Sequence, residues 1–254
     1  MILNKSLNLL LSIVKSSGAR RLSTCNKLLS YLAVNSAEES IVTLHQDLER
    51  ILKESHEKWN SYDYGEGFFY QSYPALCIYG LRNTEFRFKL YRLTSLLNPN
   101  MKVLDIGCNK GFLSLTIAKY CKNIDAFDKN PFMIYIAERC RVHEGIENAK
   151  FYCGIFSDMN IIENYDVVLS LANHHTFDGN MRPEFRCYME KIRGLLHKGG
   201  YLIFESHPNE YKNPLFNDQI HSLRNIFQID SKTIVLNARS VYDNNRIVIW
   251  LRAV

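Results

Sequence analysis

The chain has 254 residues, of which 46% are hydrophobic, so it can bury one sizeable core or one α/β domain with an extension. No run of 18 apolar residues occurs, and the longest early run, residues 7–14, is flanked by Lys5 and Lys15, so no membrane span is predicted. The seven cysteines are scattered and show no CxxC spacing. This pattern supports neither a disulfide framework nor a zinc knuckle, and it favours a reducing, cytoplasmic compartment.

The net charge of +5 is concentrated at the N-terminus. Residues 1–37 hold five basic side chains and no acidic one, whereas the rest of the chain holds 26 of each sign. A balanced body does not indicate a broad basic face for nucleic acid. Residues 1–37 are predicted to be a basic helix that packs on the domain, with an organelle-targeting segment as the alternative.

Residues 38–98 are predicted to form a helical and aromatic extension. Apolar residues at helical spacing indicate an amphipathic helix over 38–60, and Asn83 or Thr84 is the expected cap of a helix that ends at Leu97. Between them, the glycine-containing segment 61–83 is rich in aromatic residues. Either these side chains pack in the core or they close over a ligand as a lid; the candidates are Tyr62, Tyr64, Phe68, Phe69, Tyr70 and Tyr73.

Residues 99–254 alternate between short β-branched runs and helical stretches, which predicts an α/β domain with a doubly wound, mainly parallel seven-stranded sheet. The expected strands are 102–106, 123–127, 149–153, 165–170, 200–205, 231–237 and 245–252, and the expected helices are 111–121, 130–143, 182–196 and 215–227. The link between the last two strands is too short for a crossover helix, so they are expected to form a C-terminal antiparallel hairpin at the sheet edge.

The stretch VLDIGCNKGFLSL, residues 103–115, reads as a buried strand, a tight turn and the start of a helix. Such a turn directs free backbone N–H groups and the positive end of a helix dipole toward a ligand. Gly107 permits a left-handed backbone and close approach, and Gly111 permits close packing. Asn109 stands where a third glycine is common, and asparagine tolerates the left-handed conformation best among the other residues. Asp128, at the end of the next strand, is positioned to accept hydrogen bonds from ribose hydroxyls.

The ordered segments VLDIGCNKG, IDAFDKN, YDVVLSLANHHTF and LLHKGGYLIFESHP resemble the successive motifs of class I S-adenosylmethionine-dependent methyltransferases. The resemblance covers residues 102–252, includes the terminal hairpin, and implies S-adenosyl-L-methionine as cofactor. It implies that Asp105 and the Gly107–Gly111 turn hold the methionine end and that Asp128 holds the ribose. It also implies that Ile155 or Phe156 flanks the adenine and that Leu171 and Ala172 line the reactive side. The predicted cofactor-binding residues are Asp105, Gly107, Cys108, Asn109, Gly111, Phe112, Asp128, Lys129, Ile155, Phe156, Leu171 and Ala172.

Polar residues follow the fourth and fifth expected strands, where ligands bind in open α/β sheets. Because the pKa of imidazole lies near neutrality, His174 or His175 is a candidate general base that takes the acceptor's proton. Glu205 or His207 is expected to orient that base or the acceptor, beside Asn173. Each histidine could instead only hydrogen-bond backbone. The segment lacks the spacing of a metal-binding motif, so no metal ion is expected.

The expected reaction is methyl transfer to an oxygen or nitrogen atom of a small or medium-sized acceptor, such as a sugar or a lipid-linked metabolite. The layout is also similar to tRNA wobble-uridine carboxymethyl transferases, so a tRNA-modifying enzyme is one alternative. The balanced charge of residues 38–254 does not favour that tRNA partner. A non-catalytic cofactor-binding protein is a second alternative. A nicotinamide-dependent oxidoreductase is a third, although it would be expected to carry a G-x-G-x-x-G turn.

Overall fold

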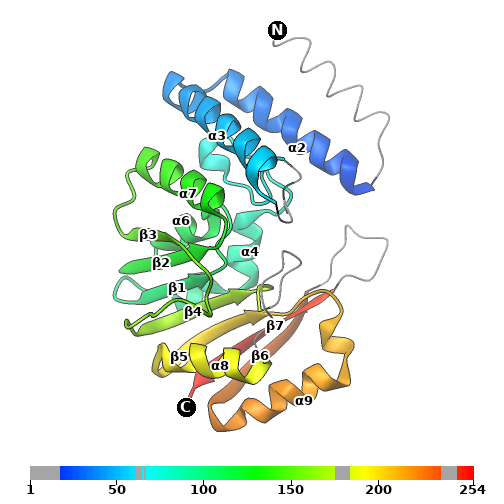
Figure 1. Cartoon of the computed structure of the whole chain (residues 1–254), viewed down its shortest axis with the longest axis vertical. Coiled ribbons are helices and arrows are strands. Elements are labelled where there is room, and N and C mark those ends of the chain that lie inside the picture. The colour runs from blue at the N-terminus through cyan, green and yellow to red at the C-terminus, as the bar shows by residue number, and fades with distance from the viewer. Residues whose placement is uncertain (1–17, 61–64, 66, 175–183, 236–244) are drawn as a thin grey trace.

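The computed structural model describes residues 18–60, 65, 67–174, 184–235 and 245–254. A seven-stranded sheet forms the centre of the molecule, in the order β3-β2-β1-β4-β5-β7-β6 (Figure 1). The strands are β1 (Lys102–Ile106), β2 (Asn123–Asp128), β3 (Ala149–Cys153), β4 (Tyr165–Leu171), β5 (Leu196–Glu205), β6 (Phe227–Val235) and β7 (Arg246–Ala253). Strands β1 to β5 pair in parallel, and β7 runs antiparallel to both β5 and β6. The predicted doubly wound sheet and its C-terminal hairpin are therefore confirmed.

Alternating side chains give the sheet two apolar faces, because successive residues of a strand point in opposite directions. The helices of the sheet are α6 (Phe112–Ala118), α7 (Pro131–His143), α8 (Phe185–Gly194) and α9 (Pro214–Ser222). Val103 of β1 belongs to the core under α6 and α7, and its neighbour Leu104 belongs to the core under α8 and α9. Burial on both faces explains why the strands read as continuous apolar runs.

The N-terminal extension consists of α2 (Gly18–Asn35), α3 (Glu39–Lys58), α4 (Thr84–Leu90) and α5 (Leu93–Leu96), with a 3-10 turn at Pro74–Leu76. Helix α3 buries Leu44, Leu48, Ile51 and Leu52 and packs against α7, and α2 lies outside it (Figure 1). Asn83, one of the two predicted caps, is the N-cap of α4: its side-chain oxygen accepts a hydrogen bond from the backbone N–H of Phe86 at 2.8 Å.

Several expected helices end earlier in the structure, including those expected over 111–121 and 182–196, which end at Ala118 and Gly194. The helix predicted over 84–97 is interrupted by Arg92, whose φ of 52° is left-handed, and it resumes as α5. The helix predicted over 215–227 ends at Ser222 and is followed by a 3-10 turn over Leu223–Asn225, after which β6 already begins at Phe227. Residues 1–17, which carry two of the five basic residues of the segment 1–37, lie outside the described residues, and the remainder of that segment contains α2. No described helix is long and apolar enough to cross a bilayer.

Candidate active site

A cavity of about 360 Å³ opens at the carboxyl ends of the parallel strands. Its wall includes residues 105–109 at the end of β1, 127–130 at the end of β2, 154–156 after β3 and 171–173 at the end of β4. In the strand order, β1 and β4 are neighbours although they are not consecutive in the chain. Chain connections leave the sheet in opposite directions at such a point, and ligands of doubly wound sheets bind there.

The turn after β1 has the backbone shape that the sequence predicted. The φ angles are 71° at Gly107, 55° at Asn109 and 72° at Gly111, so asparagine takes the left-handed conformation in the place of a glycine. A Cβ atom at Gly107 would lie 2.8 Å from Nδ2 of Asn173, so only glycine fits this position without a shift. The turn is therefore determined by local backbone chemistry and by its contact with the end of β4.

Two predicted cofactor residues shape the turn from behind and do not line the cavity. Gly111 caps α6, and a Cβ atom there would lie 2.6 Å from the ring of Phe151. Phe112 is fully buried, and its ring stacks on that of Tyr73 with 5.5 Å between the ring centres. The first residues of α6 face the core because the helix packs directly on the sheet, so Gly111 and Phe112 support the turn from the side opposite the cavity.

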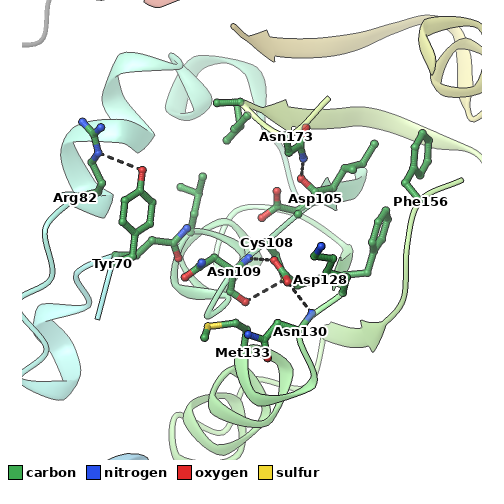
Figure 2. A pocket seen from close by; sticks show the side chains of 18 of the residues that line it. Tyr70, Arg82, Asp105, Cys108, Asn109, Asp128, Asn130, Met133, Phe156 and Asn173 are labelled. Atoms are coloured by element: carbon green, nitrogen blue, oxygen red, sulfur yellow. Dashed lines mark hydrogen bonds between the residues drawn. The ribbon is translucent and has the colours of Figure 1, made fainter. Parts of the chain in front are cut away.

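The carboxylate of Asp128 lies in the wall of the cavity (Figure 2). Its two oxygens accept the backbone N–H groups of Asn109, at 2.9 Å, and of Asn130, at 3.0 Å. These bonds join the turn after β1 to the start of α7 and fix the orientation of the carboxylate. The neighbouring Lys129 also lines the cavity, with its ammonium group 6.0 Å from the ring centre of Trp59.

Asp105 is 3% exposed and accepts a hydrogen bond of 2.6 Å from Oγ of Ser114. Burial raises the pKa of this carboxyl from 3.8 to about 6, and the hydrogen bond from Ser114 and the charge of Arg87 oppose the increase. A buried carboxylate with a raised pKa at a cavity is typical of a functional site, because its ionised form gains from a cationic ligand.

The cavity fits an adenosyl cofactor in three respects. Oδ1 of Asn109 is buried and accepts no hydrogen bond from the described residues, so it is available to a ligand donor. Ile155 and Phe156 supply an apolar wall, and the ring of Phe156 stacks on Phe127 at 5.8 Å. Cys108, Leu171 and Ala172, three further residues that the sequence predicts to contact the cofactor, also line the cavity.

Asn173 connects the ends of two strands. Its Nδ2 atom donates to the carbonyl of Ile106, and its Oδ1 atom accepts from Ser170 at 2.8 Å and from the hydroxyl of Tyr188 at 3.2 Å. Since both ends of the amide have partners, Asn173 is suited to positioning the turn rather than to proton transfer.

The predicted histidines occupy different positions. His207 lines the cavity, whereas His174 lies behind it, with a ring centre 4.9 Å from that of His207 and Nε2 3.0 Å from Oε1 of Glu210. The other oxygen of Glu210 accepts the backbone N–H of His207 at 2.9 Å. Glu210 thus holds both histidines, and His175 lies outside the described residues.

Glu205 does not orient either described histidine. Its Oε2 atom accepts the hydroxyl of Tyr91 at 2.9 Å and lies 3.7 Å from Arg87 and 3.6 Å from Arg246. The reason is the alternation of β5: Phe204 contacts His174 on one face of the sheet, so Glu205 points to the opposite face, toward α4.

Sequence reasoning missed several residues of the site, among them Gln71, Arg82, Arg87, Tyr188, Glu210 and Arg246. Arg246 begins β7, and the antiparallel register that pairs Val248 with Glu205 carries Arg246 to the end of β5. The predicted hairpin could have pointed to Arg246, because an antiparallel last strand brings its first residues to the end of β5 that borders the site. Of the predicted aromatic lid, Phe69 and Tyr73 are buried in the core and Tyr70 lines the cavity, while Tyr62 and Tyr64 lie outside the described residues. Within the described residues, no three His, Cys, Asp or Glu side chains gather as metal ligands would.

Solved structures of related shape are methyltransferases and proteins of similar fold. The chain resembles the N-methyltransferase NodS from Bradyrhizobium japonicum, solved with S-adenosyl-L-homocysteine, with a TM-score of 0.53 and 16% identity over 83% of this chain and 98% of NodS. For YcgJ from Bacillus subtilis the TM-score is 0.52, with 16% identity over 66% of this chain and 98% of YcgJ. For Trm5b from Pyrococcus abyssi it is 0.51, with 17% identity over 66% of this chain and 48% of Trm5b, so the chain spans about half of that protein. At these identities the likenesses show the fold alone.

Comparison with curated protein sequences finds no significant match. Residues 97–242, more than half of the chain, match the methyltransferase domain family. This range contains the glycine turn, Asp128 and the strand ends that form the cavity. The chain therefore belongs to the methyltransferase domain family and is a class I S-adenosylmethionine-dependent methyltransferase.

Proposed function

We propose that this methyltransferase acts on an oxygen or nitrogen atom of a small or medium-sized acceptor. The observation that carries the proposal is the continuity of the cavity, which joins the turns after β1 to β4 with Tyr70 of the extension, His207 and Arg246. Its volume of about 360 Å³ lies within the range of small-molecule sites. The cofactor takes the part lined by the glycine turn, and the acceptor takes the part beyond it.

Asp105, Gly107, Asn109 and Asp128 are the residues proposed to hold the cofactor. S-adenosylmethionine supplies a methyl group already activated on a positively charged sulfonium, so alignment and exclusion of water are the main tasks of the protein. The ionised Asp105 favours the positively charged methionine end. The buried Oδ1 of Asn109 accepts a hydrogen bond from the ligand, and Asp128 accepts hydrogen bonds from the ribose.

His207 is the proposed general base, because it is the described histidine that lines the cavity. The acceptor oxygen or nitrogen gains a bond to the methyl carbon as the S–C bond breaks with its electron pair left on sulfur, and the acceptor proton passes to His207. His174 is proposed as a positioning residue. Its ring packs against His207, and Glu210 holds the His174 side chain and the His207 backbone at once.

The test is a screen for acceptors with methyl-labelled cofactor and fractionated cell metabolites, followed by variants assayed on the acceptor found. His207→Ala should lower kcat strongly, by about 10²–10⁴-fold, with little change in S-adenosylhomocysteine affinity. His174→Ala should lower it less. His197, which is exposed near the opposite end of β5, provides the matched control, and His197→Ala should keep full activity.

Full activity of both His207→Ala and His174→Ala would refute the assignment of the base. Transfer to tRNA but to no small-molecule fraction would refute the proposed acceptor class. The two results separate the question of which residue takes the proton from the question of which molecule receives the methyl group.

A further inference from the structure

Three arginines line one end of the cavity. Arg82 lies just before α4, Arg87 lies within α4, and Arg246 begins β7, so separate parts of the chain bring three guanidinium groups to the same place. Figure 2 shows Arg82 and Tyr70 on the far side of the pocket from Phe156, the residue expected beside the adenine. The arginine end is therefore not the adenosine end.

The charges at this end do not cancel. Glu205 lies near Arg87 and Arg246, at 3.7 Å and 3.6 Å, and is 5% exposed. Arg82 has no carboxylate partner among the described residues. Its Nε donates to the neutral hydroxyl of Tyr70 at 3.2 Å, and its guanidinium lies 5.9 Å from the centre of that ring. Among the described residues, the ion pairs at this end therefore join two of the three guanidinium groups to one carboxylate, that of Glu205.

The pKa of Tyr70 shows the effect of this excess positive charge. Burial raises the pKa of its hydroxyl, but the positive charges of Arg82, Arg87 and Arg246 outweigh burial, so the pKa lies below its ordinary value. A phenol becomes easier to ionise only where negative charge is favoured. The same electrostatic potential would stabilise an oxyanion of a ligand.

Gln71 adds a second, independent sign of a ligand at this end. The side chain is 5% exposed and lines the cavity, and its buried Oε1 atom accepts no hydrogen bond from the residues that the structure describes. Buried amide oxygens in folded proteins are nearly always paired, so a polar group of a bound molecule is the expected partner.

A bound cofactor would not neutralise all three arginines at this end of the cavity. Its methionyl carboxylate would balance one guanidinium, and Arg87 is the candidate because its charge lowers the pKa of Asp105, which is proposed to hold the methionine end. Glu205 balances a second guanidinium. One positive charge remains for the acceptor, and Arg82 is the one of these three arginines that has no carboxylate partner in the described part of the chain.

We propose that the methyl acceptor is a small molecule that carries a carboxylate or phosphate group, and that Arg82 and Arg246 bind this group at the end of the cavity beside Tyr70. This inference rests on the proposed function and deepens it. The anionic group anchors the acceptor, and the oxygen or nitrogen to be methylated faces His207. Guanidinium groups suit this role, since they bind carboxylate and phosphate through paired N–H donors.

The experiment uses the full chain saturated with S-adenosylhomocysteine. Calorimetric titrations with benzoate, phenyl phosphate and the neutral benzamide compare a carboxylate, a phosphate and an uncharged probe of similar shape. At least one anion should bind measurably better than benzamide, and the tighter of the two identifies the anionic group. Arg82→Gln should lower the affinity for that anion by about tenfold or more, and Arg82→Lys should retain part of this affinity. Arg82 is partly exposed and its hydrogen bond is to Tyr70, so both variants are expected to fold.

Affinity for S-adenosylhomocysteine separates the two levels of the argument. If the wild-type protein does not bind it, the proposed function fails. If it binds but benzamide binds as well as both anions, or if Arg82→Gln leaves the anion affinity unchanged, the anionic acceptor is refuted and the cofactor site stands. An equal loss of cofactor and anion affinity in Arg82→Gln would assign the arginine to the cofactor and would also overturn the inference.

Discussion

Replacing Asp105 with asparagine should stabilise the cofactor-free protein at neutral pH. The folded protein raises the pKa of this carboxyl from 3.8 to about 6, chiefly through burial. One pKa unit corresponds to about 1.4 kcal/mol, so ionised Asp105 lowers the free energy of unfolding by up to about 3 kcal/mol. Asparagine has nearly the same shape, can still accept the hydrogen bond from Ser114, and has no charge to bury.

The sign of the pH dependence follows from the direction of the shift. Because the folded state binds this proton more tightly than the unfolded state, the contribution of Asp105 to stability is fully present below pH 3.8 and is lost as the pH rises through about 6. The advantage of Asp105→Asn over the wild type should therefore grow by about 2 kcal/mol between pH 4.5 and pH 7.5.

Urea unfolding followed by circular dichroism across this pH range measures the difference. Ser114→Ala serves as a companion variant. It removes the hydrogen bond that lowers the pKa of Asp105, so the loss of stability should extend to higher pH. A constant difference between Asp105→Asn and wild type from pH 4.5 to pH 7.5 would refute the reasoning. The gain in stability should be accompanied by weaker binding of S-adenosylhomocysteine.

Three further predictions concern the turn after β1 and its neighbours. Gly107→Ala should destabilise the protein by about 1–2 kcal/mol and weaken cofactor binding, because the added Cβ needs a left-handed backbone and meets Asn173; unchanged unfolding and calorimetry would contradict this. Asn109→Gly should keep the thermal stability nearly unchanged, whereas Asn109→Val should lower it, and equal melting temperatures would contradict the left-handed turn. Tyr188→Phe should cost about 1 kcal/mol in urea unfolding through loss of its hydrogen bonds to Asn173 and Ser170, and no change would contradict the role of this network.

Local chemistry explains what the sequence predicted well. Strand–helix alternation and β-branched runs indicated the parallel sheet, and the short link before β7 indicated the hairpin. Asn109 was expected to take the left-handed conformation and does so, with a φ of 55°. Each of these inferences depends on neighbours within a few positions of the chain.

Tertiary contacts explain what it predicted poorly. Residues 84–97 contain neither glycine nor proline, so no local signal predicts the left-handed break at Arg92. The role expected of Glu205 depended on which face of β5 it occupies, and a one-residue step along a strand reverses that face. Glu210 follows His174 by 36 positions, and only the folded chain brings their side chains to 3.0 Å.

Titration of the purified protein with S-adenosylhomocysteine, beside the variant Asp128→Ala, tests the central claim most directly. We predict saturable binding by the wild type and a loss of about 1–3 kcal/mol in binding free energy for the variant, because Asp128 lies in the wall of the cavity and is proposed to hold the ribose. NADH should not bind in the same titration. Absence of S-adenosylhomocysteine binding at millimolar concentration, or equal affinity of the wild type and Asp128→Ala, would contradict this account of the site.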